Sequence, residues 1–429
     1  MTAAQDSALP TSPARQQLGD AVVDTVKSTA PVLAEHGETI TALFYQKMFQ
    51  AHPELLNIFN TTNQKTGQQK HALAASVYNF AAHIEELDVL KAEIERIGNK
   101  HASLNVKPEH YPIVGKYLMQ ATHEVVSGLL GQETADAVVD AWTKAYALLA
   151  DLLIHKEETL YSKTESGIGG WRDTREFVLS HRQQESTDVV SFTFQPADHG
   201  PIAPYEAGQY IAISVKPEGS EYTEIRQYSL SEAWTQGQQH YRISVKRIGA
   251  DQDKPAGLVS NYLHDHLQVG DKVQLAPPRG EFTLAKGKSA KPIVLLSGGV
   301  GITPVFSMLE TLVQTEQDQP LVFVHGTENS QHHVFKQELD QLQQTGKVDN
   351  VVFYREPSND DKANEDYDHT GMVDLNKIKS QVNLPNADYY LCGPLPFMQH
   401  INQQLVDWGV AENQIHYEIF GPNRSLATG

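Results

Sequence analysis

The chain has 429 residues and a formal net charge of -19, with 53 Asp and Glu against 34 Lys and Arg. This length accommodates about three domains of ordinary size, and the acidic balance argues against nucleic acid or an anionic membrane surface as a partner, because phosphate binding relies on clustered basic side chains. The single cysteine, Cys392, excludes an internal disulfide and any metal site built from paired cysteines, whereas 19 histidines leave other ligand sets open. No signal peptide pattern and no long apolar run is present, so we expect a cytoplasmic protein with small-molecule partners.

The pattern of apolar and polar residues changes several times along the chain. Helical spacing of apolar residues dominates the first third, a glycine-rich stretch interrupts it, and strand-like patterns follow. The sequence therefore predicts a multidomain protein with these segments in chain order: a flexible tail (1–16), an all-α domain (17–161), a linker (162–170), an antiparallel β-barrel domain (171–288) and an α/β domain with a parallel sheet (289–429).

The two strand-rich segments differ in how their strands are connected. Residues 189–194, 210–215 and 241–245 alternate apolar and polar side chains with turns between them, which is typical of a small antiparallel barrel. Residues 293–296 and 321–324 instead alternate with helical stretches, which predicts a doubly wound parallel sheet.

Two helical stripes in the first domain are suited to face each other across a planar cofactor. Leu90, Ile94, Ile97 and His101 follow at spacings of four, three and four, which puts an imidazole at the end of an apolar helix face. A second stripe consists of Gln69, Leu73, Ser76 and Phe80. Spacing alone leaves two interpretations open for His101: a ligand, or a buried histidine that bonds to a backbone carbonyl.

The order of residues in this domain carries a family resemblance. It contains, in sequence, Phe44 to Phe49, Pro53-Glu54-Leu55, Phe59, Gln69, Lys100-His101, Pro108 and Tyr111. This order resembles the globin domain of bacterial flavohaemoglobins over about residues 17–161. The resemblance implies that haem b is bound and that His101 is the proximal ligand of its iron.

The same resemblance assigns partners to the expected proximal histidine. Glu157 and Tyr111 match a network behind His101, where an anionic hydrogen-bond acceptor makes an imidazole ligand more electron-donating. The alternative for Glu157 is a solvated acid near a helix end, and for Tyr111 a core aromatic residue without a chemical role.

On the opposite side of the expected haem, the resemblance implies a polar donor in an apolar pocket. Tyr45 matches the distal tyrosine whose hydroxyl donates a hydrogen bond to dioxygen, and Gln69 would assist it. Phe59 and Leu73 would wall the pocket. Lys100, beside the expected ligand, matches a position that biases the haem potential, although an exposed lysine without a role is an equal alternative.

The barrel segment contains the string Arg226-Gln227-Tyr228-Ser229, which resembles the flavin signature of the ferredoxin reductase superfamily. The resemblance implies that Arg226 faces the FAD pyrophosphate, Tyr228 packs on the flavin and Ser229 lies near its reactive nitrogen. These residue types suit the tasks, since a guanidinium donates paired hydrogen bonds to a phosphate and an aromatic ring packs against a flavin. Tyr210 matches a position near the same ring.

Two glycine-containing segments match phosphate-binding positions of the same reductases. Gly257, Val259 and Ser260 would meet the FAD phosphates, with ordinary turn chemistry as the alternative. A glycine turn between strand and helix lets backbone amides approach a pyrophosphate. The matching residues of the α/β domain, expected to bind the nicotinamide cofactor, are Gly299, Val300, Gly301, Ile302, Thr303 and Pro304.

The remaining cofactor positions lie near the C-terminus. Cys392 and Gly393 are expected in the nicotinamide pocket, with Cys392 as a packing residue rather than a nucleophile. At the edge of the flavin we expect the chain to place Glu418, Ile419, Phe420, Gly421 and Pro422. Residues 325–330 hold no Arg or Lys, which a 2′-phosphate favours, so we expect NADH rather than NADPH.

The resemblance spans about residues 17–422 and implies nitric oxide dioxygenase activity, in which NAD(P)H reduces FAD, FAD reduces haem iron, and nitric oxide and dioxygen yield nitrate. We expect a monomer. Two alternatives are an oxygen sensor or carrier, which would need only the first domain, and an NADH diaphorase or ferric or flavin reductase that carries the helical domain as a binding module.

Overall fold

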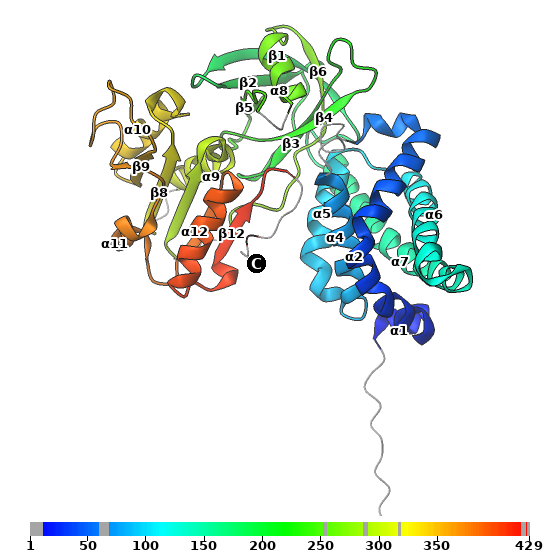
Figure 1. Cartoon of the computed structure of the whole chain (residues 1–429). Coiled ribbons are helices and arrows are strands. Elements are labelled where there is room, and N and C mark those ends of the chain that lie inside the picture. Colours follow the sequence, from blue (N-terminus) through cyan, green and yellow to red (C-terminus); the bar gives the residue numbers. More distant parts are fainter. Residues whose placement is uncertain are drawn as a thin grey trace, which may run out of the picture. The chain divides into compact units, whose positions relative to one another are not determined.

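A computed structural model of the chain describes residues 12–59, 68–251, 255–285, 291–315, 319–421 and 426. The backbone divides into two compact units, Met1–Ser162 and Lys163–Gly429. The first is helical and the second contains two six-stranded sheets, one antiparallel and one parallel, which confirms the predicted fold class (Figure 1).

The N-terminal unit is built from long helices joined by short turns. Their bounds are α1 Pro13–Leu18, α2 Asp20–Ala51, η1 Pro53–Asn57, α4 Gln68–Ala82, η2 Leu87–Leu90, α5 Lys91–Ser103, α6 His110–Leu130 and α7 Gln132–Glu165. Helix α2 packs against both α4 and α6, and Trp142 of α7 donates its indole N–H to the Thr29 hydroxyl of α2 at 2.8 Å. Helix α7 continues to Glu165, so the first residues of the expected linker are helical and belong to its last turn.

The last residues of the expected N-terminal tail, from Pro13 onward, are helical. Pro13 occupies the first turn of α1 and the Ser12 hydroxyl accepts from the Arg15 backbone N–H, so a serine cap and a proline start this helix. Arg15 then pairs with Asp24 at 2.8 Å and with Glu85. Residues 1–11 lie outside the described part of the chain.

The antiparallel sheet has the strand order β4-β3-β6-β1-β2-β5. Its elements are β1 Arg175–Gln184, β2 Val189–Pro196, β3 Tyr210–Val215, β4 Glu224–Ser229, β5 Tyr241–Lys246, α8 Leu258–Asp265 and β6 Lys272–Leu275. Beyond the end of β4, Leu230 bridges to Ile243 of β5, and the Ser231 N–H donates to the Arg242 carbonyl at 3.0 Å. The two outer strands therefore approach each other, which curls the sheet in the manner of a barrel.

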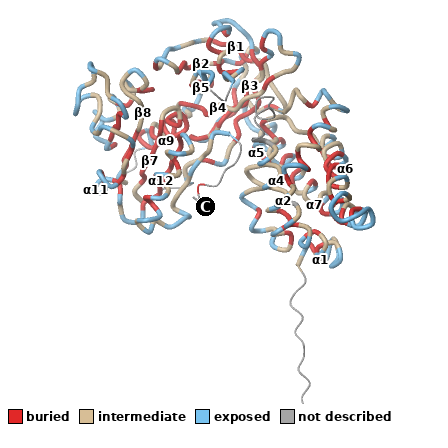
Figure 2. Tube along the Cα trace, in the orientation of Figure 1, coloured by how far each residue is buried: buried red, intermediate tan, exposed pale blue. Residues whose placement is uncertain are grey.

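The parallel sheet has the order β10-β9-β8-β7-β11-β12. Its elements are β7 Ile293–Gly298, η3 Gly299–Gly301, α9 Ile302–Gln314, β8 Leu321–Thr327, η4 Ser330–His332, α10 Lys336–Gln344, β9 Asp349–Tyr354, β10 His369–Thr370, η5 Leu375–Ile378, α11 Lys379–Val382, β11 Asp388–Cys392, α12 Leu395–Asp407, η6 Glu412–Gln414 and β12 Ile415–Glu418. One apolar cluster joins the sheet to α9 and α10, and another joins it to α11 and α12. The buried residues follow the strands of both sheets (Figure 2).

The order of the strands fixes where a ligand binds in such a sheet. The chain leaves β7 toward β8 on one side, and later returns to pair β11 on the other side of β7. Ligands of doubly wound sheets bind beyond the carboxyl ends of the strands where the order reverses. The crevice at the ends of β7 and β11 is therefore the expected dinucleotide site.

Gly208 joins the two sheets of the C-terminal unit. Its backbone N–H donates to the Ser307 hydroxyl of α9 at 3.1 Å, and its φ of +97° is a conformation that glycine adopts without strain. A Cβ at this position would lie 2.0 Å from the carbonyl oxygen of Phe282. A side chain here would clash with the Phe282 backbone and with Met308 of α9.

Gly208→Ala is expected to lower the free energy of unfolding of the C-terminal unit by about 3 kcal/mol, because backbone strain adds to overpacking. Gly219→Ala is the matched control, since Gly219 also has a positive φ of +77° but a Cβ added there would meet nothing within 4 Å. The control should cost about 1 kcal/mol from strain alone. Denaturant unfolding followed by circular dichroism measures both, and equal losses would contradict the steric argument.

Candidate functional site

His101, Tyr111 and Glu157 meet inside the N-terminal unit, each supplied by a different helix. The Nδ1 of His101 on α5 lies 2.8 Å from Glu157 Oε1 on α7 and 3.1 Å from the Tyr111 hydroxyl on α6. Tyr111 also donates its hydroxyl to the same Glu157 oxygen at 2.5 Å. The structure thus brings together the three residues that were expected from the sequence on one side of the haem.

This geometry fixes the tautomer of the imidazole. A carboxylate accepts hydrogen bonds, so the proton of neutral His101 sits on Nδ1 and the lone pair sits on Nε2. Among the residues that the structure describes, none forms a hydrogen bond with that Nε2. A neutral imidazole with Nδ1 held by a carboxylate and Nε2 open is the arrangement of a metal-ligating histidine.

The Glu157 carboxylate is buried, with 2% of its side chain exposed. Burial of a charge is costly without donors, and here Tyr111 and His101 supply them. Burial, together with the neighbouring Glu157 carboxylate, raises the pKa of Tyr111 well above its usual value, so the phenol keeps its proton. Tyr146 donates to the Tyr111 carbonyl at 2.8 Å and further fixes this helix turn.

Tyr45 lies on α2 in an aromatic cluster. Its ring is 5.8 Å from that of Phe59 in an edge-on arrangement and 5.6 Å from that of Phe49, and it is buried in the helical core against which Leu73 also packs. Tyr45, Phe59 and Leu73 thus belong to one apolar cluster, as expected for a pocket wall. The side chain of Gln69 lies outside the described part of the structure, and Lys100 is exposed.

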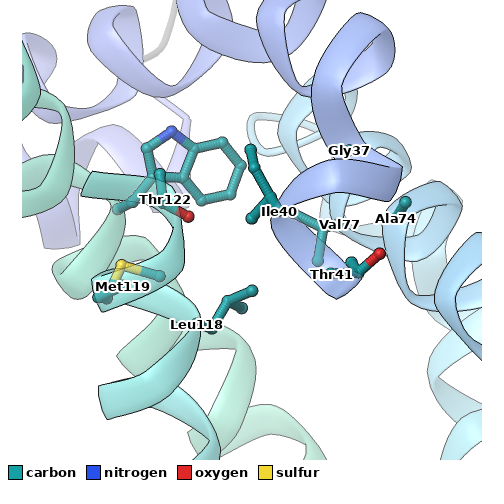
Figure 3. A pocket seen from close by; sticks show the side chains of 9 residues that line it. Gly37, Ile40, Thr41, Ala74, Val77, Leu118, Met119 and Thr122 are labelled. Carbon is teal, nitrogen blue, oxygen red and sulfur yellow. The ribbon is translucent and has the colours of Figure 1, made fainter. Parts of the chain in front are cut away.

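A small cavity is lined by residues of α2, α4, α6 and α7 (Figure 3). Ile40 and Thr41 line it from α2, about one turn before Tyr45, and Ala74 and Val77 line it from α4, directly after Leu73. Its other lining residues are Gly37, Leu118, Met119, Thr122 and Trp142. The lining is mainly apolar, so the cavity suits a small uncharged molecule rather than an ion.

The expected flavin residues lie at an edge of the antiparallel sheet. The pairing of β3 with β4 puts Tyr210 opposite Ser229 on one face, and Arg226 opposite Ile213 on the other. Because β4 is the outermost strand, a ligand along its free edge can touch both faces. Arg226 pairs with the buried Glu224 at 2.9 Å, which orients the guanidinium, and the Tyr228 ring is partly buried against the core.

The other expected FAD segment forms the start of α8. The Ser260 hydroxyl donates to the Gly257 carbonyl at 3.2 Å, and a Cβ on Gly257 would lie 2.5 Å from that hydroxyl oxygen. Val259 is 1% exposed, so its side chain is committed to the core and only its backbone is available to a ligand.

The glycine turn after β7 shows why two of its glycines are required. Gly299 has a φ of +52°, and a Cβ on Gly301 would lie 2.3 Å from the Cys392 carbonyl oxygen. The close approach joins the turn to the end of β11. No described side chain caps the N-terminus of α9, so its amides are suited to a phosphate. Ile302, Thr303 and Pro304 are buried, so their side chains pack in the interior and support the turn.

A row of polar side chains crosses the carboxyl ends of the parallel strands. His325 pairs with Ser297, Ser297 with Cys392, and Cys392 with Glu418 in register. Burial and the nearby Glu418 carboxylate raise the pKa of the Cys392 thiol well above its usual value, which agrees with a packing role. Gly393 lies against the Phe397 ring, where a Cβ would come within 2.6 Å.

The segment after β12 leads away from this row. Ile419 packs against the apolar cluster on the α12 side of the sheet, whereas the Phe420 side chain is 46% exposed. Gly421 has a φ of +127°, and Pro422 lies outside the described residues. An exposed phenyl ring at the end of β12 is available to a planar ligand.

A pair of buried histidines, which the sequence does not predict, lies beside β7. His325 Nδ1 lies 2.9 Å from the Ser297 hydroxyl, and His333 Nδ1 lies 2.9 Å from the Tyr354 hydroxyl. Their rings are 5.2 Å apart, and both Nε2 atoms are buried without a described partner. Burial lowers the pKa of His325 to about 3 and that of His333 well below its ordinary value. Their spacing along the chain carries no periodic signal.

Comparison with known families agrees with this architecture. A globin model matches residues 42–153, a model of oxidoreductase FAD-binding domains matches residues 176–284, and a model of oxidoreductase NAD-binding domains matches residues 295–403.

Full-length relatives extend the comparison to the whole chain. The flavohaemoprotein of Halalkalibacterium halodurans is 46% identical over 94% of this chain and 97% of its own length, and that of Bacillus subtilis is 43% identical over 96% and 99%. The chain belongs to the flavohaemoprotein family. It is therefore an oxidoreductase with a globin domain for haem and with FAD-binding and NAD-binding domains.

Solved structures support the same conclusion for this flavohaemoprotein. A flavohaemoglobin from Malassezia yamatoensis with bound FAD and haem superposes with a TM-score of 0.81 at 30% identity, covering 94% of this chain and all of that one. The FAD/NAD-binding domain of a nitric oxide dioxygenase from Vibrio cholerae is 42% identical, with a TM-score of 0.52 over 58% of this chain and all of that one.

Within the described residues, no helix combines the length and the apolar character needed to cross a membrane. In the same part of the chain, His, Cys, Asp and Glu side chains do not cluster in threes around a point where a metal ion could be held.

The buried histidine pair predicts a pH dependence of stability. Unfolded histidines take up protons below about pH 6.5, whereas His325 and His333 stay neutral in the folded protein until far lower pH. Stability from this pair is thus complete above about pH 6.5 and falls as the pH drops toward 3. Because the unfolded chain binds two more protons, the pair should lower the free energy of unfolding by roughly 2–3 kcal/mol per pH unit in that interval.

Urea unfolding at pH 7, 6 and 5 measures this slope. His325→Asn should reduce the slope by the contribution of about one proton. His400→Gln, at an exposed position of α12, controls for the loss of a histidine. An unchanged slope in His325→Asn would contradict the assignment.

Proposed function

We propose that this flavohaemoprotein is a nitric oxide dioxygenase that uses NADH. The observation that carries the proposal is the contact of His101 with the buried Glu157 and with Tyr111, in a chain that also holds the FAD-binding and NAD-binding domains. Its reductase portion is similar to that of a Vibrio cholerae protein described as a nitric oxide dioxygenase. An oxygen sensor or carrier would leave two domains unused.

The residues fit the three groups that the proposal requires. His101 would ligate haem iron through Nε2, Arg226, Tyr228 and Ser229 would hold FAD along the edge of β4, and the turn Gly299–Gly301 would receive the NADH pyrophosphate. When bound, these groups supply hydride transfer, its division into single electrons, and the reaction of oxygen and nitric oxide at iron.

The reaction balances with one electron for each nitric oxide. Nitric oxide, dioxygen and one electron give nitrate, so a hydride from NADH serves two nitric oxide molecules and leaves NAD⁺ and a proton. The protein must therefore deliver electrons singly, which a nicotinamide alone does not do. This requirement explains why a flavin domain lies between the NAD-binding and globin domains in the chain.

The chain's own residues prepare the haem site for that chemistry. Glu157 holds the proton at His101 Nδ1 and lends the imidazole negative charge, which favours an electron-rich ligand. Tyr111 keeps the carboxylate in place from the other side. Tyr45, buried within an aromatic wall, offers a hydroxyl for charge that develops on oxygen, and the surrounding apolar side chains exclude water.

In the reductase domains, both side chains and backbone amides would bind the cofactors. Arg226 supplies positive charge to a phosphate, and its contact with Glu224 limits the positions it can take. The amides at the start of α9, which no described side chain caps, would hold the pyrophosphate of NADH. A thiol at Cys392 that keeps its proton adds no charge beside the nicotinamide.

Glu157→Gln tests the proposal on the full chain loaded with haem and FAD. With NADH, oxygen and nitric oxide supplied, we expect the wild type to convert nitric oxide to nitrate, and the variant to do so roughly ten- to a hundredfold more slowly. NADH oxidation with ferricyanide, which needs only the reductase domains, should not change. A nitric oxide electrode and a nitrate assay provide the measurement.

Glu158→Gln is the matched control, because Glu158 is the exposed neighbour on the same helix and its carboxylate accepts from the Ser162 hydroxyl rather than from the imidazole. Its nitric oxide turnover should equal that of the wild type. If Glu157→Gln also turned over at the wild-type rate, the proposed role of Glu157 would be wrong. If the wild type itself formed no nitrate, a diaphorase would be the better assignment.

A further inference from the structure

Glu328 and Arg355 form an ion pair just beyond the ends of two neighbouring parallel strands. The Arg355 Nη2 lies 2.7 Å from Glu328 Oε2, and both side chains reach solvent. Glu328 is the first residue after β8, and Arg355 is the first residue after β9. The pair therefore stands at the carboxyl edge of the sheet, where the dinucleotide is expected.

Backbone hydrogen bonds extend the strands as far as this pair. The Arg355 N–H donates to the Thr327 carbonyl at 2.9 Å, and the Glu356 N–H donates to the Glu328 carbonyl at 3.0 Å. These bonds continue the β8–β9 ladder by one step and hold the two Cα atoms side by side. The ion pair thus has a fixed base, and only the side-chain ends are free to exchange partners.

The position of the pair relative to the glycine turn is specific for one part of a dinucleotide. The turn Gly299–Gly301 follows β7, and β8 is the neighbouring strand. When a pyrophosphate lies at such a turn, the adenosine ribose lies over the end of the next strand, where an acid accepts from its 2′-hydroxyl or an arginine receives a 2′-phosphate. Here the acid and the arginine occur together.

We propose that Glu328 and Arg355 together read the 2′ position of the adenosine ribose, with Glu328 accepting from the 2′-hydroxyl of NADH and holding Arg355 away from a 2′-phosphate. Arg355 is then a latent phosphate site that the wild-type chain keeps neutralised. This inference rests on the proposed use of NADH and deepens it. Residues 325–330 contain no basic side chain, and the fold brings one from the following strand.

The charges around the pair also disfavour a 2′-phosphate. Glu356 follows Arg355 directly, and the Asp361 carboxylate accepts from the backbone N–H groups of Ser358 at 2.7 Å and Ser330 at 3.4 Å. The Asp361 carboxylate thus lies beside Ser330, two residues after Glu328, and adds a second negative charge near the pair. A 2′-phosphate, which carries about two negative charges, would be repelled, whereas a 2′-hydroxyl would not.

Calorimetric titration of the full chain with two nucleotide probes tests the inference. The probes are 2′,5′-ADP, which carries the 2′-phosphate, and 5′-AMP, which does not. Glu328→Gln should raise the affinity for 2′,5′-ADP relative to 5′-AMP by roughly tenfold, since it releases Arg355 and removes one repelling charge. Rapid reduction of the bound FAD by NADPH relative to NADH should change in the same direction.

Two further variants separate a specific site from general charge effects. Glu328→Gln/Arg355→Gln should lose the gain, because the latent cation is gone, and Glu356→Gln should change the ratio less than about threefold, as a screened neighbouring charge does. An unchanged ratio in Glu328→Gln, or a gain that survives loss of Arg355, would overturn the inference. Neither result depends on nitric oxide, so nitrate formation by the same variants tests the proposed function separately.

Discussion

The hydrogen bond from His101 Nδ1 to Glu157 is the interaction on which the haem site depends. A carboxylate with 2% exposure is stable only with donors, and the imidazole and the Tyr111 phenol provide them at one oxygen. The contact joins α5, α6 and α7, so the packing of these helices fixes the direction of the imidazole. The hydrogen bonds at Nδ1 therefore fix the direction in which Nε2 points, and the packing of the three helices holds these bonds in place.

In the C-terminal unit the backbone, more than the side chains, shapes the site. Gly301 lets the turn after β7 approach the Cys392 carbonyl, and Gly208 lets the antiparallel sheet approach α9. Around these contacts, Val259, Ile302 and Thr303 are buried, and their side chains contribute support rather than contacts to a ligand. The groups available to a dinucleotide are amides at the α9 N-terminus and the side chains at the strand ends.

Much of this arrangement follows from the sequence, for identifiable reasons. Alternation and helical spacing predict the strands and helices, since each pattern reports burial on one face. The family resemblance adds His101, Tyr111 and Glu157, although 56 residues separate His101 from Glu157 and no local period links them. The roles assigned to all the site residues remain predictions, and the side chain of Gln69 and the whole of Pro422 also lie outside the described residues.

What the sequence does not predict depends on which strands become neighbours. Glu328 meets Arg355, and His325 meets His333, because β8 pairs with β9 and because η4 follows β8 closely. The edge position of β4 likewise depends on the strand order. The start of α1 is different: the Ser12-Pro13 cap is a local signal, but the residues before it show no helical periodicity.

Removal of the imidazole tests the central claim most directly. His101→Ala, prepared as the full chain with FAD bound and compared with the wild type, would be supplied with NADH, oxygen and nitric oxide at an electrode. We predict that nitrate formation disappears while NADH-dependent ferricyanide reduction continues at the wild-type rate. Rapid NADH-dependent loss of nitric oxide in this variant would contradict His101 as the iron ligand and the dioxygenase assignment built on it.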